Sequence, residues 1–185
     1  MNTTIADDFE VLSSKSNYFK MVPGEHRIRV LSNSISGWLW WVEEGDGTRK
    51  PQRITLDQNP PVEFADSVKK FLTFVVWNYD VERIQVWEVT QASIQKELKR
   101  LDHDTDWGAL TGYDLKITRV GTDMNSTRYA VTPKPKSELG KEIEKATKDG
   151  LPVLEALYKG EDPFKFNPNA VEEVDQEKVD KDLSF

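Results

Sequence analysis

Apolar and polar residues alternate with a period of two along several short stretches of the chain, and this spacing is typical of half-buried β-strands. In 26–31, for example, Ile28 and Val30 face one side while Arg27 and Arg29 face the other. Together with short apolar runs, the pattern predicts strands at 26–31, 37–42, 70–79, 83–89, 113–120 and 127–132. The strand at 70–79 is apolar on both faces, which predicts a central position in the sheet.

Polar and proline-containing stretches separate these predicted strands. Residues 43–53 are interpreted as a polar loop rich in Gly, Asp and Thr, and an extended stretch follows through 59–61. Pro133 and Pro135 are expected to end the sheet, because proline lacks the N–H group that a strand ladder requires.

A helical period appears after the fourth predicted strand. Ile94, Leu98 and Leu101 recur at helical spacing, and Thr90 is suited to cap the N-terminus, so we predict an amphipathic helix over 92–101. The basic residues on its outward face are Lys96, Lys99 and Arg100.

The C-terminal part of the chain shows no strand period. Residues 137–159 indicate one or two short helices, and Pro152 is suited to a first helical turn. From Gly160 onward periodicity is lost, and we expect a disordered acidic tail.

The order of these elements indicates a mainly β fold with a helix inserted after the fourth strand. The oligonucleotide-binding (OB) fold is a five-stranded barrel of this class, commonly with a helix between its third and fourth strands. We therefore expect a five- to six-stranded OB barrel with short C-terminal helices. The expected divisions are an N-terminal arm at 1–22, the barrel at 23–136, a helical or extended appendage at 137–170 and the tail at 171–185.

Each predicted strand has a more apolar face, which we assign to the inside of the barrel. The inward set is Ile28, Val30, Leu39, Trp41, Leu72, Phe74, Val76, Ile84, Val86, Leu115, Ile117, Tyr129 and Val131. The outward set is Arg27, Arg29, Trp38, Trp40, Phe71, Trp77, Arg83, Gln85, Trp87, Lys116 and Arg128. Solvent-facing strand residues are normally Thr, Lys, Glu and Ser, whereas this outward set consists mostly of aromatic residues and cations.

Aromatic residues interleaved with cations suit the binding of single-stranded nucleic acid. Rings stack on unpaired bases, worth about 1–3 kcal/mol per base, and cations neutralise phosphates. For a single aromatic residue the alternative is packing beneath a loop, a helix or a partner subunit, and this alternative is favoured for Trp41 and Trp107. Repetition of the pattern over four strands favours an interaction surface.

The net charge of −7 is unevenly distributed along the chain. Residues 15–136 hold 18 basic and 16 acidic residues, and they are the only net-positive segment. The tail at 171–185 holds six acids and two lysines. This distribution fits a polyanion-binding body with a regulatory acidic tail, and it also fits an acidic protein with a solubilising tail.

Several classes of function lack the residues they require. The chain has no cysteine, which excludes disulfides and thiolate chemistry and favours a reducing, cytoplasmic compartment. The N-terminus does not resemble a signal peptide, and the longest apolar run, 71–77, is too short for a membrane span. His26 and His103 lack partner ligands at metal-binding spacing, and the acidic run 102–106 lacks the glycine and closing glutamate of a calcium loop. We expect no enzymatic activity, no cofactor, no metal and no membrane partner.

Three motifs resemble the replication single-stranded DNA-binding proteins of tailed bacteriophages, which are distantly similar to the helix-destabilising protein of the T-even phages. They are VWN at 76–78, QVWEVTQASI at 85–94, and the hairpin GYDLKITRxG…TRYxV at 112–131, within a resemblance that covers 18–135. The resemblance implies an OB barrel that coats single strands during DNA replication, recombination and repair. It also implies that the binding surface lies on the hairpins.

The pattern and the resemblance together give the candidate binding residues. For single-stranded DNA they are Arg27, Arg29, Trp38, Trp40, Lys69, Lys70, Phe71, Trp77, Arg83, Trp87, Lys116, Arg119 and Arg128. The tail resembles the acidic, aromatic-ended tails of bacterial and phage single-strand binders, which recruit replication proteins and compete with DNA. The candidate tail residues are Asp180, Asp182, Leu183 and Phe185. Two departures from the T-even pattern are the missing zinc-binding cysteines and an acidic rather than basic N-terminal arm.

The resulting hypothesis is a sequence-tolerant single-stranded DNA-binding protein without catalytic activity. It would act in the cytoplasm, in a host bacterium if a phage encodes it, with phage or host replication proteins as partners. Trp77 and Trp87 are expected to stack on bases. The alternatives are an interaction or structural module that self-associates through its tryptophan-rich face, and a binder of single-stranded RNA.

Overall fold

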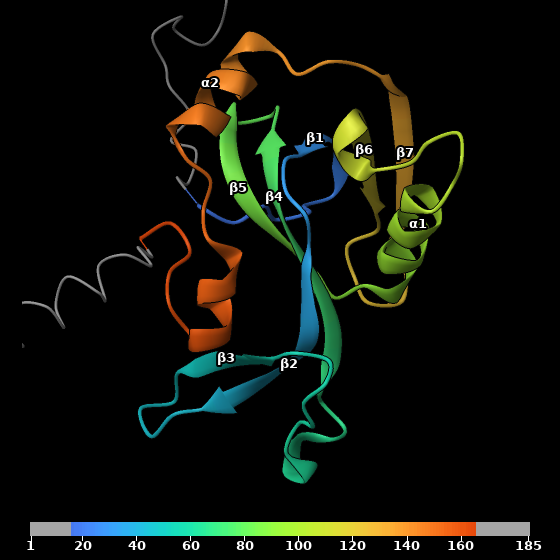
Figure 1. Ribbon diagram of the computed structural model, residues 1–185. Helices are drawn as coiled ribbons and strands as arrows, with labels where there is room; N and C mark the ends of the chain where they lie inside the picture. Colours follow the sequence, from blue (N-terminus) through green and yellow to red (C-terminus); the bar gives the residue numbers. More distant parts are fainter. Residues whose placement is uncertain (1–15, 166–185) are drawn as a thin grey trace, which may run out of the picture.

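The computed structural model describes residues 16–165 and shows a mainly β protein (Figure 1). Within this range seven strands join in one sheet, and every pairing between them is antiparallel. The strands are β1 (Gly24–Val30), β2 (Ile35–Glu43), β3 (Arg49–Ile54), β4 (Lys69–Asn78), β5 (Arg83–Val89), β6 (Tyr113–Val120) and β7 (Arg128–Lys136). The candidate tail residues Asp180, Asp182, Leu183 and Phe185, and most of the predicted N-terminal arm, lie outside the described residues.

The long strand β4 connects the two halves of the sheet. One edge of β4 pairs with β2 over Lys69–Thr73 and with β1 over Val76–Asn78, and its other edge pairs with β5. Beyond β1 the sheet continues through β6 to β7. These pairings on both edges confirm the prediction of a central strand at 70–79.

The strand β3 forms where the sequence pattern predicted a polar loop. It pairs with β2 from Trp38 opposite Ile54 to Glu43 opposite Arg49. Backbone hydrogen bonds make this ladder regardless of side-chain polarity, so a strand without an apolar face gives no periodic signal. Gly37 permits the close approach of β2 to the end of β3, because a Cβ atom at position 37 would overlap the carbonyl oxygen of Ile54.

The strand β7 continues through Pro133 and Pro135 to Lys136, so the prediction that these prolines end the sheet is wrong. Among the described residues β7 pairs only with β6, which makes it an edge strand. Proline is tolerated on an edge strand, because an N–H group on the open side of that strand would have no ladder partner.

Two apolar clusters lie on opposite faces of the sheet. The larger packs Phe74 and its neighbours against α1 (Ala92–Asp102), where Leu98 is buried. The smaller packs Val75 and its neighbours against the 3₁₀ helix η3 (Leu154–Lys159). Because adjacent residues of β4 point to opposite faces, the central strand is covered on both sides.

The helices agree closely with the sequence pattern. The helix α1 confirms the prediction for 92–101, but its N-cap residue is Gln91 rather than Thr90, and no side-chain capping hydrogen bond forms there within the described chain. The helix α2 (Lys141–Asp149) and η3 agree with the expectation of one or two short helices in 137–159. Two further 3₁₀ turns are η1 (Val62–Phe64) and η2 (Leu110–Gly112).

The described part of the N-terminal arm lies along the outer edge of β5. The amide of Phe19 donates to the carbonyl oxygen of Val86 at 2.9 Å, and the amide of Val86 donates to the carbonyl oxygen of Asn17 at 2.9 Å. Tyr18 and Val86 form a parallel bridge, and the ring of Phe19 is buried in the larger apolar cluster. This segment therefore covers an edge that would otherwise be open to other strands.

The packing of η3 gives a first testable prediction. Leu157 is buried against the smaller cluster, so Leu157→Ala is expected to lower the free energy of unfolding by about 2–5 kcal/mol. Urea denaturation measures this change. Glu155→Ala, an exposed position on the same helix, is the control and is expected to stay within about 0.5 kcal/mol of wild type. Equal stability of the two variants would show that η3 does not contribute to the core.

Candidate nucleic-acid interface

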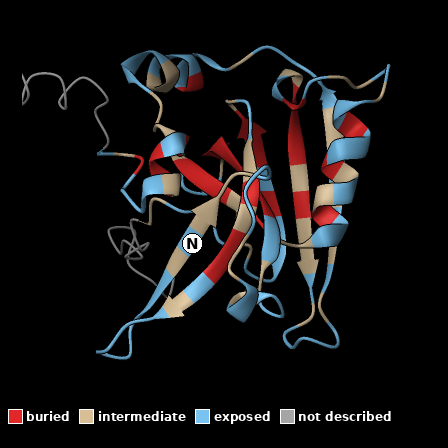
Figure 2. Cartoon of the chain, turned by 60° about the horizontal axis from the view of Figure 1, so that its bottom comes forward, coloured by how far each residue is buried: buried red, intermediate tan, exposed pale blue. Residues whose placement is uncertain are grey.

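Most of the aromatic residues assigned to the outward face are buried, so their assignment to solvent is wrong. Trp87 is fully buried, with its ring 5.9 Å from that of Phe19 and 6.1 Å from that of Phe74. Phe71 is also buried and lies beside the ring of Tyr158. Figure 2 shows buried positions gathered along the central strands of the sheet. In this fold, Trp87 and Phe71 are not accessible to a base.

Trp40 and Trp77 are covered by segments distant in the sequence. Trp40 is 6% exposed and stacks on Phe64 of η1, with the ring centroids 6.1 Å apart. Trp77 is 7% exposed and lies against α2, where it lines a small cavity with Ile143. The strands do alternate between two faces, but both faces of each strand pack against other parts of the chain. The expected stacking role of Trp77 and Trp87 therefore does not fit this fold.

Two tryptophans of β2 remain accessible. Trp41, assigned to the inside, is 45% exposed, so that assignment is also wrong. Trp38 is half-buried, and the ammonium nitrogen of Lys70 lies 5.1 Å from its ring centroid. Trp38 and Lys70 face each other across the β2–β4 ladder. A ring and a cation held together in this way offer one surface for a base and one charge for a phosphate.

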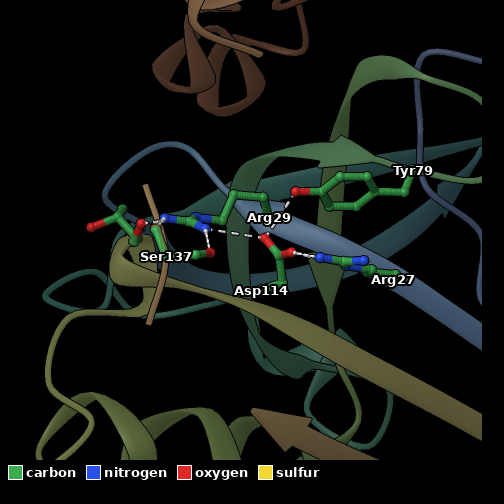
Figure 3. Close-up of polar contacts among 6 residues, drawn as sticks. Arg27, Arg29, Tyr79, Asp114 and Ser137 are labelled. Atoms are coloured by element: carbon green, nitrogen blue, oxygen red, sulfur yellow. Dashed lines mark hydrogen bonds and ion pairs between the residues drawn. The ribbon is translucent and has the colours of Figure 1, made fainter. Parts of the chain in front are cut away.

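Arg27 and Arg29 are engaged in a polar network centred on Asp114 of β6 (Figure 3). Arg27 donates from Nε and Nη2 to Oδ2 of Asp114 at 2.8 and 2.5 Å, and Arg29 donates from Nη1 to Oδ1 at 3.1 Å. The hydroxyl of Tyr79 donates to the same Oδ1 at 3.0 Å. Arg29 also donates to the backbone oxygen of Ser137 at 2.6 Å. The network joins β1, β6, the end of β4 and the segment after β7.

The two arginines of this network differ in how far their side chains are exposed to a ligand. The side chain of Arg29 is 3% exposed and that of Asp114 is 2% exposed, so this ion pair is buried. The side chain of Arg27 is 56% exposed, and its hydrogen bond to Asp114 raises its pKa. Burial, followed by the hydrogen bond to Asp114, raises the pKa of Tyr79. The prediction that Arg29 faces solvent is wrong, whereas Arg27 remains partly available.

The remaining cations of the predicted set divide into those held by polar groups of the chain and those without an ion pair. Lys116 pairs with Glu25 at 3.0 Å. Arg83 donates to the side chain of Asn17, and Arg119 donates to the backbone oxygen of Met21. Arg128 donates to the backbone oxygens of Asn125 and Thr127. Lys69 and Lys70 are exposed, and neither forms an ion pair within residues 16–165.

A cleft of about 760 Å³ opens between α1, the first half of β4, the β1–β2 connection and η2. We call it the lysine cleft. Its apolar residues include Leu56, Leu72, Phe74, Leu98 and Leu110. Its polar and charged residues include Ser32, Asn33, Ser34, Gln95, Lys70, Lys96, Lys99, Asp102 and His103. Volumes of about 300–1,000 Å³ with an apolar lining and a few polar groups are typical of ligand sites.

The charge of the lysine cleft is mainly positive. Lys70, Lys96 and Lys99 form no ion pair with any described residue. The one acidic residue of the lining is Asp102, whose Oδ2 lies 3.9 Å from Nδ1 of His103. Lys96 and Lys99 are three residues apart on α1 and therefore project from neighbouring positions on one side of the helix.

Lys96 and Lys99 were expected on the outward face of the helix, but they were not among the predicted site residues. The signal was present in the amphipathic pattern of 92–101. The pattern could not show that Lys70 and the β1–β2 connection lie opposite this face of the helix. Asn33 and Ser34 gave no signal, because a short polar connection between two strands is common.

The acidic stretch after α1 forms a hydrogen-bonded turn. Oδ1 of Asp104 accepts the amides of Asp106 and Trp107, at 2.8 and 3.2 Å, and these hydrogen bonds lower the pKa of Asp104. Burial, with a smaller effect from the nearby acids Asp102 and Asp104, raises the pKa of Tyr113 to about 12. No group of three or more potential metal ligands occurs in residues 16–165.

Comparison with known proteins gave no match. No protein-family model, no curated protein and no solved structure matched the chain. Among the residues that the structure describes, no helix combines the length and the apolar character needed to cross a membrane.

Proposed function

We propose that the protein binds single-stranded DNA in the lysine cleft, without catalysis and with little sequence preference. The observation that carries this proposal is the meeting of Lys70, Lys96 and Lys99 around an apolar cleft, with the accessible ring of Trp38 beside Lys70. Unpaired strands present phosphates for the lysines and exposed bases for apolar and aromatic surfaces. A duplex would bury its bases and leave the apolar lining without a partner.

The order of the elements supports the proposal. When β1 and β2 are counted as one bent strand and β3 is left out as an addition to the edge of β2, five strands remain, with α1 between the third and the fourth, as in an OB fold. The pairings of β1 with β6, β4 with β5, and β6 with β7 also suit that fold. In the described residues β5 does not pair with β7, so the sheet is open. OB barrels are themselves partly open.

The sequence resemblance gives this proposal its biological setting. The motifs at 85–94 and 112–131 resemble those of phage replication single-strand binders. We therefore propose a role in coating single strands during phage DNA replication, recombination and repair. The acidic tail would recruit phage or host replication proteins.

The structure weakens one alternative function. An interaction module was suggested by a tryptophan-rich face open to a partner, but Trp40, Trp77 and Trp87 are covered by this chain itself. Single-stranded RNA offers the same phosphates and bases as DNA, and it differs at the 2′-hydroxyl. A direct comparison of the two polymers therefore belongs in the test.

The test is a fluorescence-anisotropy titration of labelled oligo(dT) at several salt concentrations. Three phosphate contacts predict a slope of about −2 for the logarithm of the binding constant against the logarithm of salt concentration. We expect saturable binding to oligo(dT), weaker binding to an oligo(rU) of equal length, and weakest binding to duplex. Tighter binding to the ribo-oligomer would assign the cleft to RNA. Absence of binding to either strand at low salt would overturn the proposal.

A further inference from the structure

We propose that the lysine cleft takes one base of the bound strand out of the stack and encloses it. This inference rests on the proposed function and adds how the strand is held. The cleft extends from charged residues on the outer face of α1 to side chains of the larger apolar cluster, such as Phe74 and Leu98. Lysines alone would suffice to bind phosphates. The apolar side chains in the inner part of the cleft therefore indicate that the ligand also has a less polar part.

A nucleobase matches the chemistry of this space. It has two apolar faces and a polar edge, and the cleft combines Leu72, Phe74 and Leu98 with the polar side chains of Asn33 and Gln95. A cleft of about 760 Å³ falls in the range that holds small-molecule ligands. Among the described residues, Asn33 makes no side-chain hydrogen bond, which leaves its amide available to a base edge.

Gln95 provides a fixed acceptor in the lining. Its Nε2 donates to the backbone oxygen of Lys70 at 2.9 Å and to that of Val89 at 2.8 Å. Both amide protons are therefore used, and the orientation of the side chain is set by β4 and β5. Its Oε1 has no partner within residues 16–165 and can accept from an N–H on the edge of a base.

The opposite wall of the cleft is also held in place. Oγ of Ser32 accepts the amide of Val75 at 2.9 Å and donates to the backbone oxygen of Asn33 at 2.8 Å. The β1–β2 connection is thus tied to β4 rather than left free. Lys96 and Lys99 lie along the rim, where they can hold the phosphates next to the enclosed base, and Trp38 can stack on a neighbouring base.

The experiment compares two ligands and a pair of matched variants. The ligands are oligo(dT) and an abasic deoxyribose-phosphate oligomer of the same length. Ala92→Leu adds volume at an exposed residue that lines the cleft, and it adds no ring that could itself stack on a base. Ser93→Leu adds the same side chain at the next, exposed residue of α1, which does not line the cleft. Ser34→Leu fills the opposite wall and serves if Ala92→Leu unfolds the helix.

Wild type is expected to prefer oligo(dT) to the abasic oligomer. Ala92→Leu is expected to weaken oligo(dT) binding by about tenfold, the size of one lost base contact, and to leave abasic binding unchanged. Ser93→Leu is expected to match wild type with both ligands. Unchanged oligo(dT) affinity in both cleft variants, or an equal loss with the abasic oligomer, would overturn base capture while the proposed function stands. Failure of wild type to bind oligo(dT) would instead overturn the proposed function.

Discussion

Replacing Asp114 with asparagine is expected to lower the free energy of unfolding by about 3–5 kcal/mol, because it leaves the buried guanidinium of Arg29 without a countercharge. The amide keeps the size of the carboxyl group but removes its charge and one acceptor oxygen. Because Arg27 donates to Oδ2 of Asp114 and Tyr79 donates to Oδ1, one of these two residues also loses its acceptor. Urea denaturation monitored by circular dichroism measures the change.

A matched control exists on the same two strands. Glu25 of β1 pairs with Lys116 of β6, but both side chains are much more exposed than those of the buried pair. Glu25→Gln is expected to change the free energy of unfolding by no more than about 1 kcal/mol. If Asp114→Asn behaved like Glu25→Gln, the network would contribute no more than a surface ion pair.

A double-mutant cycle separates the charge pair from the rest of the network. The combination of Arg29→Met with Asp114→Asn is expected to be less destabilising than the sum of the two single changes. The physical reason is that removing both partners leaves no buried charge unpaired. Additive effects would show that Asp114 acts through Arg27 and Tyr79 alone.

The second large effect concerns binding. The double variant Lys96→Glu/Lys99→Glu is expected to weaken oligo(dT) binding by about tenfold or more, because two phosphate contacts are replaced by repulsion. The slope against salt concentration is expected to decrease in magnitude by about 1.4, which corresponds to two contacts on a single strand. Fluorescence anisotropy at several salt concentrations measures both quantities.

The control for this experiment lies on α2. Lys145 and Lys148 are also three residues apart and exposed, and neither lines the lysine cleft. Lys145→Glu/Lys148→Glu therefore changes the net charge of the protein equally. We expect this variant to keep most of the affinity and the full salt slope. Equal losses in the two variants would mean that net charge, rather than the lysine cleft, determines binding.

Local periodicity was sufficient to predict most of the elements. The apolar run at 70–79 predicted a central strand, and Ile94, Leu98 and Leu101 predicted α1 with its basic outward face. These predictions succeeded because strand and helix periods are set by local backbone geometry. The strand β3 and the continuation of β7 past Pro133 were not predicted, since both depend on a neighbouring strand or on an edge position.

The candidate site was predicted only in part. Lys70 and Trp38 belong to the predicted set and lie beside each other, and Arg27 stays partly exposed. Trp87 is fully buried and Arg29 is held by Asp114, although alternation had placed both on the outward face. The alternation identified two faces of each strand, but it did not show that η1, η3 and α2 would cover the second face.

The sequence by itself determined the periods of the chain, the mainly β class and the positions of the charged residues. Only the tertiary structure decided which aromatic residues are buried, which arginines are used in internal ion pairs, and which lysines meet in one cleft. The physical reason is the range of the interactions. Period and propensity act between residues a few positions apart, whereas burial and ion pairing join segments such as β1 and β6, which are more than eighty residues apart in the chain.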